Sequence, residues 1–199
     1  AHMSFLLGLT GSIGMGKSTT ARLFVDRGCK AWDADSIVHR AYRKNGVAVA
    51  GVGKIAPSAV SNGAVDHAKL RQLISQDANL LSKLEAIIHP LVKADREDFI
   101  ANNPKSILVF DIPLLFELNS AADFDAVACV LSSYEVQKSR VLSRPGMTED
   151  HFQLIRSKQW LAEDKAARAD YTIDTNSHET AAQAVDAILE DIKKRQKDA

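Results

Sequence analysis

The sequence predicts an α/β domain built on a mostly parallel β-sheet. Short apolar runs alternate with helical patterns along the chain, which is the arrangement of parallel α/β proteins. The runs are apolar without interruption, as expected of strands that are covered on both faces. A length of 199 residues suits one domain, or one domain with insertions.

Five segments are predicted to be strands of this sheet. The runs 106–111 and 126–131 are the strongest, and the run 171–173 is the shortest. The complete set, in chain order, is residues 5–10, 29–32, 106–111, 126–131 and 171–173. Each is long enough to lie buried in a sheet and too short for a typical helix.

Helical patterns occupy most of the remaining chain. The first follows the first strand and stops at Gly28, because glycine commonly ends a helix. The predicted helices are residues 18–27, 36–44, 66–75, 79–101, 135–143, 149–161 and 180–194. Pro90 lies inside the long one and is expected to kink or interrupt it, since proline lacks a backbone N–H donor.

Two stretches break the alternation and suggest how the domain is organised. Residues 35–104 contain no strong strand and hold a part rich in Gly, Ala and Ser, residues 46–63, followed by helices, so they are predicted to form a mostly helical insertion. Residues 141–169 are charged and helical, and Arg144-Pro145-Gly146 resembles a hinge, so they are predicted to form a lid. The core is then residues 4–34, 105–140 and 170–199.

Composition excludes several classes of function. Lys plus Arg and Asp plus Glu number 25 each, and this zero net charge argues against a nucleic-acid-binding protein. No apolar run approaches 18 residues and no signal-peptide pattern precedes the first strand, so no membrane span is expected. Cys29 and Cys129 have neither disulfide nor zinc spacing, and they predict two reduced thiols in a cytoplasmic protein.

The strongest motif follows the first strand directly. Residues 11–18 read G-S-I-G-M-G-K-S and match G-x-x-x-x-G-K-[ST] at every fixed position, between a strand and a helix. The glycines allow backbone N–H groups to approach phosphate oxygens, and the helix directs its positive end to the same anion. Lys17 would then reach the β- and γ-phosphates, and Ser18 would bind Mg²⁺. The alternative is a glycine-rich turn that binds nothing.

Two carboxylates follow the second strand. Ligands of open parallel sheets bind at the carboxyl ends of strands, so Asp35 could accept a hydrogen bond from an acceptor hydroxyl and orient it for attack. Asp35 could equally be the N-cap of the next helix. Asp33 is a candidate for a helper or a water-bridged Mg²⁺ ligand.

Other candidates lie farther along the chain. Asp111 ends the third strand, where an acid often holds Mg²⁺ through water, or it simply terminates the strand. The segment 112–117 is either a ligand wall or the start of a helix. Arg140 and Arg144, ahead of Arg156, could clamp phosphates, although arginines on helices are most often only solvated.

Together these motifs resemble the dephospho-coenzyme A kinase family over nearly the whole chain. The shared pieces are residues 9–19 (L-T-G-S-I-G-M-G-K-S-T), Asp33-Ala34-Asp35, residues 89–92 (H-P-L-V), residues 111–117 (D-I-P-L-L-F-E), Arg140, Arg144, residues 147–149 (M-T-E), Gln159 and residues 169–173 (A-D-Y-T-I). The phosphate loop occurs in many activities, whereas the ordered set is far more specific.

The resemblance implies an enzyme that uses ATP to phosphorylate the 3′-hydroxyl of dephospho-CoA, the last step of CoA synthesis. It implies a P-loop kinase core with a five-stranded parallel sheet, a CoA-binding helical insertion and a helical lid. It also implies ATP and Mg²⁺ as cofactors, and neither a nucleic acid nor an obligatory protein partner.

The family's functional residues can be carried over one by one. The resemblance implies catalytic roles for Asp35, Lys17 and Arg140. It implies nucleotide binding by Gly11, Ser12, Ile13, Gly14, Met15, Gly16, Lys17, Ser18, Thr19 and Arg144. It implies acceptor binding by Asp33, Asp35, His89, Pro113, Leu114, Leu115 and Glu117, and a metal site at Ser18 and, through water, Asp111.

The sequence also departs from the family pattern at two places. The usual Asn and Gly after the last strand are replaced by Asp174-Thr175-Asn176-Ser177, which leaves the adenine contacts open. The usual Asp-Arg of the insertion is Asp66-His67. The rival interpretations are a shikimate or gluconate kinase, which would lack so long an insertion, and a GTP-binding switch, which would need an Asn-Lys-x-Asp motif that does not occur.

Overall fold

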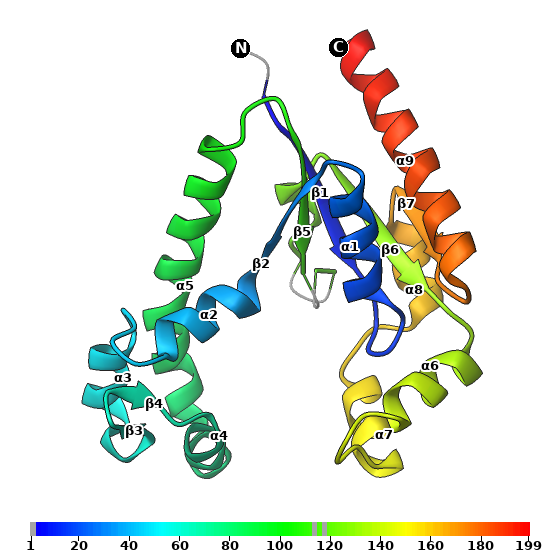
Figure 1. Cartoon of the computed structure of the whole chain (residues 1–199). Helices are drawn as coiled ribbons and strands as arrows, with labels where there is room; N and C mark the ends of the chain where they lie inside the picture. Colours follow the sequence, from blue (N-terminus) through cyan, green and yellow to red (C-terminus); the bar gives the residue numbers. More distant parts are fainter. Residues whose placement is uncertain (1–2, 113–114, 117–118) are drawn as a thin grey trace. The chain divides into compact units, whose positions relative to one another are not determined.

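The computed structural model describes residues 3–112, 115–116 and 119–199 (Figure 1). The chain packs into two compact units. The first comprises residues 1–32 and 103–199, and the second comprises residues 33–102. Each unit has its own cluster of buried apolar side chains.

The described part of the first unit carries a five-stranded sheet with the order β2-β5-β1-β6-β7. The strands are β1 (Phe5–Thr10), β2 (Lys30–Asp33), β5 (Ile107–Asp111), β6 (Ala126–Leu131) and β7 (Tyr171–Asp174). β1 pairs in parallel with β5 and β6, and β6 pairs in parallel with β7. The predicted α/β fold class is therefore confirmed, and β6 has the predicted bounds.

Both faces of this sheet are covered, which explains why its strands are apolar throughout. On one face, Leu7 and Leu9 of β1 pack with Val130 of β6 and with α1 (Lys17–Asp26) and α9 (His178–Asp198). On the other face, Gly8 lies against Leu115 and Phe124: an added Cβ would come within 2.7 Å of Leu115. Successive residues of one strand thus serve two different cores.

Three more helices of the first unit follow β6: α6 (Tyr134–Leu142), α7 (Glu149–Ser157) and α8 (Ala162–Arg168). A short 3-10 turn, η2 (Ala121–Asp123), precedes the same strand. The prediction of one helix over residues 149–161 was wrong, because the chain leaves the helix after Ser157. Gln159 there bonds to Ile13, and Trp160 stacks on Phe116. These tertiary contacts outweigh the local helical preference.

The second unit is mostly helical, with α2 (Ala34–Tyr42), α3 (Val49–Ile55), a 3-10 turn η1 (Pro57–Ala59), α4 (His67–Gln76) and α5 (Ala78–Ala101). It also contains a small antiparallel hairpin, β3 (Val60–Ser61) and β4 (Ala64–Val65), that the sequence reasoning missed. Asn62-Gly63, both at positive φ, form its turn. An Asn-Gly pair between apolar residues was the available signal.

Helix α5 continues through Pro90, so of the two outcomes expected there, a kink or an interruption, the interruption is wrong. Proline removes one hydrogen bond from the ladder, but buried Leu80 and Leu84 and half-buried Leu91 pack into one cluster on both sides of it. That shared packing holds the two halves in one helix.

No helix within the described residues combines the length and the apolar character needed to cross a membrane. Cys29 and Cys129 are both buried thiols, as expected. Burial raises the pKa of the Cys29 thiol, which keeps it in its protonated form.

Candidate active site

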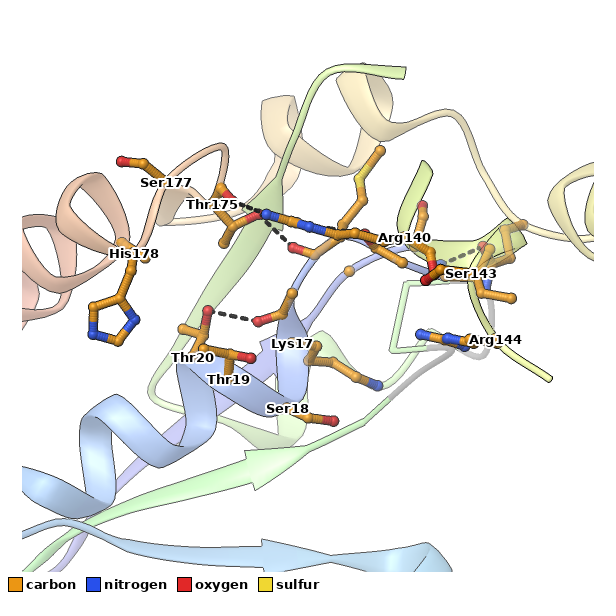
Figure 2. A pocket seen from close by; sticks show the side chains of 18 of the residues that line it. Lys17, Ser18, Thr19, Thr20, Arg140, Ser143, Arg144, Thr175, Ser177 and His178 are labelled. Atoms are coloured by element: carbon orange, nitrogen blue, oxygen red, sulfur yellow. Dashed lines mark hydrogen bonds between the residues drawn. The ribbon is translucent and has the colours of Figure 1, made fainter. Parts of the chain in front are cut away.

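A cavity of about 650 Å³ opens in the first unit at the end of β1 (Figure 2). Its floor is the loop that the sequence motif predicted, and its walls come from α1, α6, α7 and the residues after it, and the start of α9. The lining residues are Gly11, Ser12, Ile13, Gly14, Met15, Gly16, Lys17, Ser18, Thr19, Thr20, Arg140, Ser143, Arg144, Ile155, Gln159, Thr175, Ser177, His178 and Ala181. All the residues predicted to bind the nucleotide are among them.

The loop takes its shape from two glycines at positive φ. Gly14 has φ 72° and Gly16 has φ 86°, a region that residues with side chains rarely adopt. Gly14 also packs directly on α6, where an added Cβ would come within 2.4 Å of Val141 and 3.0 Å of the Gln137 carbonyl oxygen. Gly16 is the N-cap of α1 and offers no capping side chain. The first N–H groups of α1 therefore remain available to an anion in the cavity.

Lys17 and Asp111 form an ion pair, with 2.7 Å between Lys17 Nζ and an Asp111 carboxylate oxygen. The register of the sheet brings them together. Asp111, the last residue of β5, lies opposite Leu9 near the end of β1, and the loop after β1 leads to Lys17, the first residue of α1. Both side chains are largely buried, with 17% and 19% exposed. A phosphate that binds Lys17 must therefore share the ammonium group with Asp111 or displace it.

The three candidate arginines lie in two different places. Arg140 of α6 donates to the Gly14 carbonyl oxygen at 3.5 Å and to the backbone carbonyl of Thr175. Arg144 lies near Lys17 in the view of Figure 2 and lines the same cavity. Arg156 instead lies over the ring of Tyr134, 4.6 Å from its centroid, and lines a separate cavity.

Thr175, Ser177 and His178 line the cavity but were not predicted to do so. The Thr175 hydroxyl is buried between two carbonyl oxygens, 2.5 Å from that of Met15 and 3.0 Å from that of Leu131. In Figure 2, His178 lies at the end of the cavity away from Arg144. Their position just after the carboxyl end of β7 was the signal that could have indicated them.

Three acceptor-side candidates belong to the second unit. Asp33 is the N-cap of α2, and its carboxylate accepts from the Asp35 backbone N–H at 2.9 Å. The alternative that Asp35 itself is the cap is therefore wrong: the helix begins two residues earlier than predicted, and Asp35 lies in its first turn. His89 is exposed on α5, next to Pro90.

The fourth acceptor-side segment belongs to the first unit. Leu115 is completely buried in a cluster with Phe116 and Val127, so it packs in the core, and the expectation that it contacts a ligand finds no support in its position. Pro113, Leu114 and Glu117 lie outside the described residues. The structure therefore gives no account of the proposed apolar wall.

The five-stranded sheet, the glycine-rich loop and the cationic cavity define a P-loop kinase. A family model described as dephospho-CoA kinase matches residues 5–181. A dephospho-CoA kinase of Ruegeria pomeroyi is 50% identical over 191 residues, which cover 96% of this chain and 97% of the relative. The chain belongs to the dephospho-CoA kinase family.

Solved structures agree with this assignment at the level of the fold. A protein from Thermus thermophilus superimposes with a TM-score of 0.85 at 26% identity, covering 95% of this chain and 98% of that one. A shikimate kinase from Acinetobacter baumannii reaches 0.52 at 17% identity, with coverages of 96% and 94%. The shikimate kinase shares the fold alone, and the shikimate kinase alternative is not favoured.

Proposed function

We propose that this enzyme transfers the γ-phosphoryl group of ATP to the 3′-hydroxyl group of dephospho-CoA, giving CoA and ADP. Membership of the dephospho-CoA kinase family supports the reaction and the substrate. The observation that carries the nucleotide half is the cavity itself. It combines a glycine-rich phosphate loop with Lys17, Arg140 and Arg144.

The nucleotide-binding half of the mechanism follows from charge. The transition state of phosphoryl transfer is loose and spreads negative charge over the γ-phosphate oxygens. Backbone N–H groups of Gly14 and of Gly16 to Thr19 would cradle the phosphates, since the Met15 N–H is bonded to the Ser12 carbonyl oxygen. Lys17 would leave Asp111 for the β- and γ-phosphates. Arg140 and Arg144 would neutralise the charge that develops during transfer.

The residues present also fit a magnesium ion. Mg²⁺ prefers oxygen ligands, and in kinases it keeps several waters and uses one or two protein groups besides the phosphates. The Ser18 hydroxyl and the Asp111 carboxylate supply such oxygens, and the described residues contain no cluster of three or more His, Cys, Asp or Glu that would suit another metal. When bound, Mg²⁺ would neutralise charge on the β- and γ-phosphates.

The acceptor half is assigned to the second unit, residues 33–102. Asp35 would accept a hydrogen bond from the 3′-hydroxyl group and orient its oxygen toward the γ-phosphorus, because a loose transition state needs positioning more than a strong base. Asp33 would support this by holding the start of α2. His89 and the segment with Pro113, Leu114 and Glu117 would contact the rest of the acceptor.

The absence of disulfide spacing supports a cytoplasmic location, and no obligatory protein partner is proposed.

The direct test is ADP release in a coupled assay with ATP and Mg²⁺. Dephospho-CoA, shikimate, gluconate and adenosine are offered in parallel as acceptors. We expect rapid turnover with dephospho-CoA only, and EDTA should abolish it. Turnover with another acceptor instead would keep the nucleotide site and overturn the assignment of the acceptor.

A further inference from the structure

Ile13, at the tip of the phosphate loop, is held from two sides by glutamine side chains. Its backbone N–H donates to Gln159 Oε1 at 3.1 Å, and its carbonyl oxygen accepts from Gln137 Nε2 at 2.8 Å. The two glutamines come from different elements, 124 and 146 positions away in the sequence. Neither was assigned a role by the motif analysis.

Both contacts are made by groups that packing keeps in place. Gln137 lies in the middle of α6 and is only 1% exposed, so its carboxamide cannot satisfy its hydrogen bonds with bulk water. The loop also touches the α6 backbone, because Gly14 leaves no room for a side chain there. Turning the Gln137 carboxamide away would leave a buried polar group without its partner.

Gln159 is fixed by the residue that follows it. Trp160 stacks on Phe116, with ring centroids 6.2 Å apart and planes 12° apart, and the Arg168 guanidinium lies 4.4 Å from the Trp160 ring centroid. These contacts anchor the turn after α7 to the apolar cluster under the sheet. The Gln159 carboxamide therefore reaches the loop from a supported position.

We propose that Gln137 and Gln159 are positioning residues that hold the phosphate loop in its nucleotide-binding shape before ATP arrives. A donor and an acceptor on opposite sides of Ile13 set the orientation of the two peptide groups that lead into Gly14. The N–H groups at the start of α1, which no side chain caps, are then in place for the phosphates without being reorganised when they bind. The Ile13 N–H is bonded to Gln159 and the Met15 N–H donates to the Ser12 carbonyl oxygen at 3.2 Å, so the N–H groups proposed to bind the phosphates are those of Gly14 and of Gly16 to Thr19.

The first test changes the hydrogen-bond acceptor at position 159. It does not measure enzyme activity, so it is independent of the proposed function. Gln159→Met removes the acceptor, whereas Gln159→Glu keeps an acceptor oxygen for the Ile13 N–H. We expect hydrogen exchange at the Ile13 amide, followed by NMR in the full chain, to accelerate at least tenfold in Gln159→Met. It should stay within about twofold of wild type in Gln159→Glu.

The matched control is Gln153→Met on the same lid segment. Gln153 donates to the Tyr134 hydroxyl at 3.0 Å and accepts from Arg156 at 3.5 Å, and neither bond involves Ile13, so its loss should leave Ile13 exchange unchanged. The exchange of the Leu7 and Leu9 amides in β1 reports whether the fold itself has loosened. Unchanged Ile13 exchange in Gln159→Met would overturn the proposal, as would equal acceleration in the control.

The second test is kinetic and rests on the proposed function. Gln137→Met and Gln159→Met should each raise the KM for ATP about tenfold, while the KM for dephospho-CoA stays within twofold. A merely structural role would instead reduce the active fraction and leave both KM values unchanged, which would overturn the proposal. If wild type failed to use dephospho-CoA, the assigned reaction would be wrong, whereas the exchange experiment would still decide the role of the glutamines.

Discussion

The two units of this kinase present their polar residues in different ways. In the first unit, two of the cations that line the cavity are held by the fold: Lys17 by Asp111, and Arg140 by the Thr175 backbone. In the second unit, Asp35 and His89 lie on exposed helical surface above a small apolar core. The residues proposed to bind the nucleotide are thus held by contacts within the fold, whereas those proposed to bind the acceptor lie on exposed surface.

The largest expected effect comes from removing the Lys17–Asp111 ion pair of the first unit. Lys17→Met removes the cation proposed to bind the β- and γ-phosphates and leaves the Asp111 carboxylate without its ammonium partner. We expect kcat/KM to fall by about 10³-fold or more, since groups that stabilise the phosphoryl-transfer transition state have effects of this size. Steady-state kinetics measure this loss. Lys30→Met, at an exposed position of β2, should stay close to wild type.

The next largest effect is expected at Asp35, on the exposed surface of the second unit. Asp35→Asn keeps the size of the side chain and removes its charge, so turnover should fall by roughly 10²- to 10⁴-fold. The KM for ATP should change little, because Asp35 is not assigned to the nucleotide. Glu85→Gln, also exposed in the second unit, serves as the control. Turnover within a few-fold of wild type in Asp35→Asn would contradict the assigned role.

A substitution in the core of the second unit tests whether the two units have separate roles in substrate binding. Leu84 is 4% exposed in the second unit, and Leu84→Ala should lower the free energy of unfolding by about 2–5 kcal/mol in urea titrations. Leu81→Ala, at a position 46% exposed on the same helix, should cost less than about 0.5 kcal/mol. We expect the Leu84 variant to raise the KM for dephospho-CoA more than the KM for ATP. Equal changes in both would argue against separate roles for the units.

The smallest effect concerns Tyr171, whose hydroxyl donates to Asp191 at 2.5 Å. Burial, followed by this hydrogen bond, raises the pKa of Tyr171 from its ordinary value of 10.0 to about 12. A raised pKa in the folded state contributes stability below pH 10 that is lost as the pH approaches 12. Tyr171→Phe should cost about 1 kcal/mol at pH 8 and remove this alkaline loss.

Denaturant titrations at pH 8, 10 and 11 measure the Tyr171 effect. The difference in unfolding free energy between wild type and Tyr171→Phe should shrink as the pH rises. A difference that is constant across this range would contradict the assigned cause of the pKa shift.

Local signals in the sequence were sufficient for the sheet and for the loop. A short uninterrupted apolar run such as residues 126–131 favours a buried strand because it is too short for a typical helix, and the structure has β6 at those residues. The motif 11–18 works through its own backbone and the helix that follows, so its chemistry is legible from eight consecutive residues. The fold class and the floor of the cavity were therefore predictable.

The tertiary structure alone decided how that loop is held and what pairs with its lysine. Asp111 meets Lys17 only because β5 lies beside β1 in a particular register, and Thr175 reaches Met15 from the far end of the chain. The end of helix α7 at Ser157, short of the predicted residue 161, has the same origin, since Gln159 and Trp160 gain partners distant in the sequence. Contacts between residues so distant in the chain leave no periodicity or spacing in the sequence, because they depend on how the elements pack and not on how neighbouring residues follow one another.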